Sequence, residues 1–139
     1  MNEILDKALT LKSDVDWRTL FTTAYVGFLP KSVVGQPGMI IFIFESLIDI
    51  SETESKVIGS YEFQLKPPFA QTDIFDGHFN LKERSFSVKG FDTKDPWTIT
   101  GELSENGLVI HVSITHSNSI SERFSAIHEN TFDALTAEP

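Results

Sequence analysis

The sequence predicts a mainly β domain, with N-terminal helices followed by a seven- or eight-stranded antiparallel meander that forms a strongly curved sheet or a small up-and-down barrel. From Gly38 onward, apolar residues alternate with polar ones, as they do in strands with one buried face. The connectors between these segments are too short to hold the helix of a parallel crossover. Glycines recur on the apolar faces of neighbouring strands, where they allow a sheet to bend.

Length and composition define the broad class of protein. The chain has 139 residues and is 40% hydrophobic, which suits one domain over residues 1–139 with a core of its own. Its 11 Lys and Arg against 20 Asp and Glu give a formal net charge of -9, which repels phosphate backbones and argues against nucleic acid as a partner. The absence of cysteine excludes disulfides and thiolate metal sites, and we predict neither a metal nor a cofactor.

The N-terminal residues indicate the expected compartment. Met1–Asp6 carries acidic residues where a signal peptide needs basic ones. The longest apolar run, Met39–Phe44, has six residues, whereas a spanning helix needs about 20. We therefore expect a cytoplasmic protein that does not use a membrane.

Residues 1–28 are predicted to be helical, because apolar residues recur there at helical spacing. The second part of this segment places Trp17, Leu20 and Phe21 on one side. Its threonines weaken a helix, so residues 22–28 could instead be a strand. The acidic, aperiodic tail at residues 130–139 is expected to be frayed.

The meander is predicted to cover residues 38–129. In each strand segment, apolar residues stand at every second position and so share one face. The segments are Gly38–Ile50, Val57–Leu65, Phe75–Leu81, Ser85–Gly90, Trp97–Leu103, Leu108–Thr115 and Ile120–His128.

Loop lengths then predict the register of individual hairpins. With Lys82 and Glu83 as a loop, Phe79 faces Phe86 and Gly77 faces Val88. A type I′ turn at Asn106-Gly107 places Leu103 opposite Ile110 and Ile99 opposite Ile114.

The last hairpin needs a three-residue loop at 117–119 to place Val112 opposite Phe124. This register turns Glu122 inward, with His116 as the next inward residue on the partner strand. Because a buried carboxylate needs a partner, we expect Glu122 at one mouth of the barrel, close to His116.

The first strand of the meander is apolar on both faces. Parity places Phe42, Phe44, Ile48 and Ile50 inward and leaves an outward strip of Met39, Ile41, Ile43 and Leu47. Such a strip must be covered, either by the N-terminal helices or by a second copy of the chain. The sequence thus predicts a possible homodimer through Met39, Ile41, Ile43 and Leu47.

Residues 38–128 resemble the lipocalin and avidin type of small barrel, through their short hairpins and their inward glycines and aromatics. The resemblance is architectural. The lipocalin Gly-x-Trp signature is missing, since Val15-Asp16 precedes Trp17, and Trp97 is the single tryptophan of the sheet, where avidins have several. No residue role is therefore transferred. A helix followed by a curved sheet is also similar to the cystatin-like and nuclear-transport-factor-like α+β cones, which form the alternative fold.

The leading functional hypothesis is non-catalytic binding of a small apolar or aromatic ligand inside the barrel. Inward side chains supply an aromatic lining suited to such a guest, unless the same side chains pack solidly. The predicted ligand-binding residues are Phe42, Phe44, Tyr61, Phe63, Phe79, Phe86, Trp97, His116 and Glu122.

Two other functions remain open. An acidic protein-interaction module, such as an inhibitor or adaptor for a basic partner, fits the net charge and the outward apolar strip. An enzyme of the cone-shaped kind would need an inward acid–base pair, for which His116 and Glu122 are the candidates. Asp76 and His78 also share a face, but that face is the polar outer one, so we interpret them as solvated surface residues.

Overall fold

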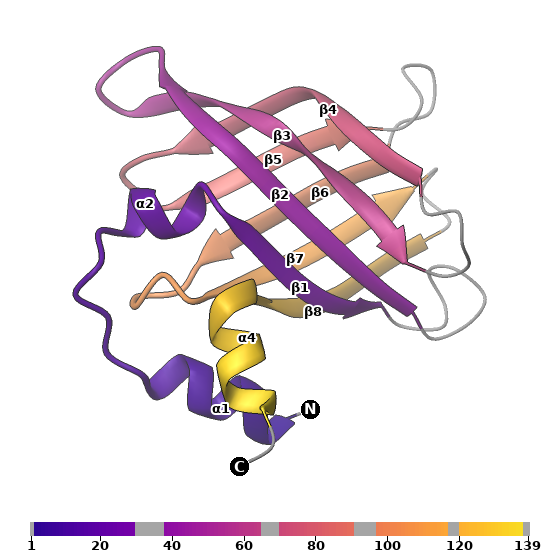
Figure 1. Ribbon diagram of the computed structural model, residues 1–139. Coiled ribbons are helices and arrows are strands. Elements are labelled where there is room, and N and C mark those ends of the chain that lie inside the picture. Colours follow the sequence, from indigo (N-terminus) through magenta and orange to yellow (C-terminus); the bar gives the residue numbers. More distant parts are fainter. Residues whose placement is uncertain (1, 30–37, 65–69, 91–96, 117–119, 138–139) are drawn as a thin grey trace.

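The computed structural model describes residues 2–29, 38–64, 70–90, 97–116 and 120–137, and shows a closed antiparallel barrel (Figure 1). Its eight strands follow one another around the barrel in chain order, and the last pairs with the first. The predicted mainly β fold with an up-and-down barrel is therefore confirmed, and the open-sheet and cone alternatives are not adopted.

The strands are β1 (Ala24–Leu29), β2 (Gly38–Asp49), β3 (Glu54–Gln64), β4 (Ala70–Asn80), β5 (Ser85–Gly90), β6 (Trp97–Leu103), β7 (Val109–His116) and β8 (Ile120–His128). The helices of the described residues are α1 (Asn2–Thr10), α2 (Trp17–Phe21) and α4 (Glu129–Thr136).

The expectation that residues 1–28 are helical throughout is wrong, because α2 ends at Phe21 and β1 follows it. The Thr22 hydroxyl donates a hydrogen bond to the Arg18 carbonyl at 2.8 Å, and the Thr23 hydroxyl donates to the Leu20 carbonyl. The two threonine hydroxyls thus satisfy backbone carbonyls of the last turn of α2, where the helix ends. The next residues form strand β1, which pairs with β2 on one side and with β8 on the other. The stabilisation from these two pairings does not appear in the local spacing of apolar residues, which is why the sequence favoured a helix.

The expectation of a frayed tail is also wrong for residues 130–136, since α4 runs to Thr136. Phe132 and Leu135 of α4 pack with α1 over Val109 and Ile127, which lie on the outer face of the barrel. Figure 1 shows the two helices side by side against β1, β7 and β8. Both helices persist because each covers apolar surface of the other and of the sheet.

The predicted hairpin registers are confirmed. Phe79 pairs with Phe86, Leu103 with Ile110 and Val112 with Phe124. The loop conformation at 117–119 lies outside the described residues.

The type I′ turn at Asn106-Gly107 is wrong, because only Gly107, with φ 79°, adopts a positive φ there. The Gly107 N–H donates to the Ser104 carbonyl and the Ser104 N–H to the Val109 carbonyl. Since Ser104 still pairs with Val109, and the four residues 105–108 between them keep the same centre, the register is unchanged.

The parity expected for the second half of β2 is reversed. The register between β2 and β3 shifts between Phe44 and Ser46, so that Glu45 is an extra residue in a β-bulge. Beyond the bulge Leu47 packs against the core, whereas Ile48 is 50% and Ile50 is 59% exposed. Leu47 therefore does not belong to the outward strip, and Ile48 and Ile50 do not face inward.

Helix α2 closes one end of the barrel. The Phe21 side chain is fully buried inside it, with its ring centroid 4.4 Å from that of Phe44 and 4.7 Å from that of Phe79. Trp17 stacks on Phe79 at 5.2 Å. An ion pair between Arg18 Nη2 and Asp49 Oδ1, 2.8 Å long, joins α2 to β2. These contacts make a solid aromatic core at the α2 end.

Candidate ligand-binding site

The predicted ligand-binding residues separate into two groups along the barrel. Phe44, Phe79 and Phe86 are buried around Phe21 at the α2 end. Sequence reasoning assigned Phe21 to a helix face and missed its role inside the barrel. The available signal was the apolar side of α2, which had to bury its rings somewhere, but nothing local indicated the barrel interior.

The second group lies toward the opposite end and is called the Tyr61 cluster. It consists of the predicted residues Phe42, Tyr61, Phe63 and Trp97, and of Phe124, which was not among the predicted ligand-binding residues. Phe63 stands near the end of β3, and Trp97 begins β6, at the end of the barrel away from α2 (Figure 1).

Ring contacts connect this cluster from the barrel interior outward. The Tyr61 and Phe63 centroids are 5.5 Å apart in an edge-on arrangement, and those of Phe63 and Trp97 are 5.8 Å apart. On the other side of Tyr61, the Phe42 ring stacks on Phe124 at 6.3 Å. Phe42 and Tyr61 are fully buried, whereas Phe63, Trp97 and Phe124 are half-buried. Within the cluster, only Phe63, Trp97 and Phe124 therefore offer aromatic surface that a ligand can contact.

The hydroxyl of Tyr61 is the one unsatisfied side-chain oxygen buried among the described residues. Burial raises the pKa of this phenol well above its usual value, so the group stays protonated and is a donor. Gly90 makes room for the ring, because a Cβ there would lie 2.9 Å from the Tyr61 oxygen. By contrast, the buried Tyr25 hydroxyl donates to the Gly107 carbonyl at 2.8 Å. An unpaired buried donor costs about 1–3 kcal/mol, a cost that a bound acceptor would remove.

The register places Glu122 on the same side of the sheet as buried Ile114, as predicted, and the residue is half-buried. His116 pairs with Ile120. The side chain of His116 lies outside the described residues, so its proximity to Glu122 stays a prediction.

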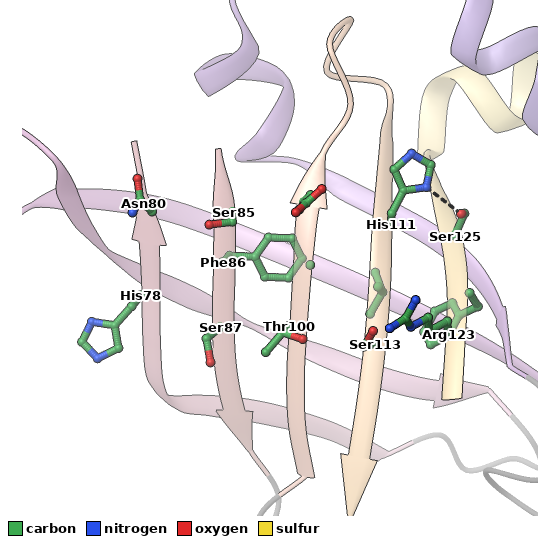
Figure 2. A pocket seen from close by; sticks show the side chains of 14 residues that line it. His78, Asn80, Ser85, Phe86, Ser87, Thr100, His111, Ser113, Arg123 and Ser125 are labelled. Atoms are coloured by element: carbon green, nitrogen blue, oxygen red, sulfur yellow. Dashed lines mark hydrogen bonds between the residues drawn. The ribbon is translucent and has the colours of Figure 1, made fainter. Parts of the chain in front are cut away.

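The outer face of β4 to β8 carries a groove of about 870 Å³ (Figure 2). Its lining is mostly polar and comes from all five strands: His78, Asn80, Ser85, Ser87, Thr100, Glu102, His111, Ser113, Arg123 and Ser125, above Phe86, Gly101, Val112 and Phe124. Sequence reasoning placed several of these residues on the solvated face but did not identify a groove.

His78 borders this groove on β4, held between two carboxylates. Its Nδ1 lies 2.8 Å from Glu54 Oε1 and its Nε2 lies 2.9 Å from Asp76 Oδ1. Asp76 and His78 are thus surface residues, half exposed, as interpreted from the sequence. Among the residues that the structure describes, no group of three or more His, Asp or Glu side chains could hold a metal ion.

Within the described ranges, no helix has the length and apolar character needed to cross a membrane. In comparisons with known proteins, no family model matches the chain, and no curated protein or solved structure is significantly similar to it.

Proposed function

We propose that this protein is a non-catalytic binding domain for a small apolar or aromatic molecule with one hydrogen-bond acceptor, which it holds at the Tyr61 cluster. The observation that carries this proposal is the buried, unpartnered Tyr61 hydroxyl within a set of aromatic rings. A barrel with a buried aromatic cluster is compatible with ligand binding, and the orphan donor adds a preferred position for an acceptor.

The packing of the α2 end favours a small ligand, because aromatic side chains already fill that part of the barrel. Phe21 occupies the interior between Phe44, Phe79 and Phe86, so a ligand inside the barrel would have to bind toward the Tyr61 end. A ligand there would contact the half-buried rings of Phe63, Trp97 and Phe124. Aromatic pairs of this kind contribute about 0.5–1.5 kcal/mol each beyond their buried area. An apolar ring with one carbonyl or ether oxygen matches both features.

The test compares acetophenone with ethylbenzene, which has a similar shape and no acceptor. A Trp17→Phe background keeps an aromatic ring on Phe79 and leaves Trp97 as the single tryptophan, whose indole N–H resonance is followed by NMR. We expect acetophenone to bind about five-fold more tightly, the value of one net hydrogen bond. Tyr61→Phe should remove that difference and leave ethylbenzene binding unchanged.

Failure of both compounds to shift the Trp97 resonance at millimolar concentration would refute the proposal. An unchanged preference for acetophenone in Tyr61→Phe would show that the hydroxyl is not the donor. Phe132→Leu on α4, on the outer face of the barrel, is the matched control and should leave both affinities as they are.

An acidic protein-interaction module is the second candidate. It is favoured by outward apolar side chains on neighbouring strands, where Phe28, 38% exposed, pairs with Met39. The net charge of -9 would attract a basic partner. Affinity capture at low and high salt tests this function, since attraction by net charge fades as ionic strength rises.

A further inference from the structure

The outer groove forms because, along one row of residues, the side chains on the three central strands are short, whereas those on the two flanking strands are long. His78, Ser87, Thr100, Ser113 and Arg123 lie opposite one another in a continuous cross-strand row. The three central strands contribute only hydroxyl side chains to this row, whereas the flanking β4 and β8 contribute His78 and Arg123. Short residues therefore form the floor and the two long residues form the rims, as Figure 2 shows.

A second row runs parallel to the first, two residues along each strand. It consists of Asn80, Ser85, Glu102, His111 and Ser125. The ring of His111 is fixed by a 2.9 Å hydrogen bond between its Nδ1 and Ser125 Oγ. Glu102, directly opposite His111, is exposed and lines the groove.

Arg123 is an unusual cation for this chain. The protein has nearly twice as many acidic as basic residues, yet the side chain of Arg123 makes no hydrogen bond or ion pair with another described residue. Arg18, by comparison, is paired with Asp49, and Arg84 Nη2 donates to the Ser104 carbonyl. A free guanidinium at the rim of a polar groove matches a carboxylate or phosphate, which it binds through paired N–H donors.

From these features we infer that the groove binds a monosaccharide carrying one carboxylate or phosphate group. Arg123 takes the anionic group, the hydroxyls of Ser87, Thr100 and Ser113 exchange hydrogen bonds with the sugar hydroxyls, and Glu102 accepts from one of them. Glu102 would repel a plain inorganic anion, so the hydroxyls are part of the recognition. Because β6 and β8 are two strand spacings apart, about 10 Å, one sugar ring with its acidic group spans the distance.

The polar side chains of this site stand on the outer face of the sheet, whereas the Tyr61 cluster lies on the inner face; Phe124 of that cluster lies beneath the floor of the groove. The experiment titrates the full chain with glucuronate, glucose 6-phosphate, glucose and inorganic phosphate, using calorimetry and amide NMR shifts. We expect at least one acidic sugar to bind ten-fold or more tightly than both glucose and inorganic phosphate, with shifts mapping to β5–β8. The two acidic sugars distinguish a carboxylate from a phosphate ligand.

Arg123→Gln should weaken binding of that sugar at least ten-fold, the loss expected for a charge-assisted hydrogen bond. Thr100→Val, which keeps the shape, should weaken it several-fold. Lys7→Gln on the exposed face of α1 makes the same change of charge far from the groove and should have no effect. Circular dichroism checks that each variant is folded.

Several outcomes would overturn the inference. These are no binding of either acidic sugar at millimolar concentration, equal affinity for inorganic phosphate, equal affinity in Arg123→Gln, or shifts confined to the Tyr61 end of the barrel. None of them bears on whether acetophenone binds at the Tyr61 cluster, so the two proposals can fail independently.

Discussion

Removing the Phe21 ring should convert the solid α2 end of the barrel into a cavity. The ring is fully buried and lies within 6.4 Å, centroid to centroid, of Phe44, Phe79, Phe86 and Tyr25. Because these four rings are held by the barrel wall, they cannot move in to fill the space that Phe21→Ala would leave.

The expected loss of stability has two parts. Returning a fully buried phenylalanine to water costs about 2–3 kcal/mol. The remaining cavity, of about 100 Å³ before relaxation, costs about 2 kcal/mol more at 24 cal/mol per Å³. Phe21→Ala should therefore lower the free energy of unfolding by about 4 kcal/mol. Phe21→Leu refills much of the volume and should cost about 1 kcal/mol.

Urea unfolding followed by circular dichroism measures both values. Benzene provides a second readout, since an apolar cavity of this kind binds it and is stabilised by mass action. Benzene should raise the unfolding midpoint of Phe21→Ala to a greater extent than that of the unmodified protein. A loss below about 1 kcal/mol in Phe21→Ala would refute the conclusion that α2 fills the barrel.

Three further predictions concern other parts of the chain. Gly107→Ala should cost about 1–2 kcal/mol by urea unfolding, because φ is 79° and the new Cβ would lie 2.8 Å from Leu20 Cδ1; an unchanged stability would contradict this. Burial lowers the pKa of His128 below its ordinary value of 6.5. The free energy of unfolding should therefore be highest above pH 6.5 and fall as the pH drops from 6.5 toward the pKa of the folded state, because the unfolded chain takes up the proton first. Stability measured from pH 8 to 5 should show this slope, and His128→Gln should flatten it; an NMR titration giving a raised pKa would reverse the sign. Replacing Ile41 and Ile43 with Lys should give a folded monomer by light scattering if the strip on β2 forms a homodimer, an idea that fails if the unmodified protein is already monomeric.

The hairpin registers show what local sequence can determine. Phe79 opposite Phe86 follows from alternation and a predicted loop at Lys82 and Glu83, because in an antiparallel pair a one-residue slip would turn every apolar side chain outward. The observed loop has four residues, 81–84, but it keeps the same centre, so the register is unchanged. The information lies within about twenty residues of the chain, so no knowledge of distant contacts is needed. The same reasoning placed Val112 opposite Phe124 and turned Glu122 to the inner side.

The β-bulge at Glu45 shows where this reasoning stops. One extra residue reversed the facing of Leu47 and Ile48, and alternation alone cannot reveal it because β2 is apolar on both faces. The pairing of β2 with β3 decides where the extra residue is placed. Alternation thus placed the aromatic candidates Phe42, Tyr61 and Phe86 at positions that the structure buries. It did not show how far along the barrel each one lies, and ligand binding at these residues stays a prediction.

The sequence by itself determined the meander, its registers and the aromatic character of the interior, because those depend on side-chain period and loop length. Only the tertiary structure decided that residues 24–29 close the barrel, since that strand is stabilised by β2 and β8 together. Only the tertiary structure placed Phe21 inside the barrel. It also brought Asn106 to the end of α1, where its side-chain amide donates hydrogen bonds to the Ala8 carbonyl in the helix and to the carbonyl of Leu11 just beyond it, at 2.7 and 2.8 Å. The groove likewise depends on five strands aligned side by side, which brings Arg123 and the serine and threonine hydroxyls onto one surface. Such contacts join residues up to about a hundred positions apart, and no local pattern carries their energy.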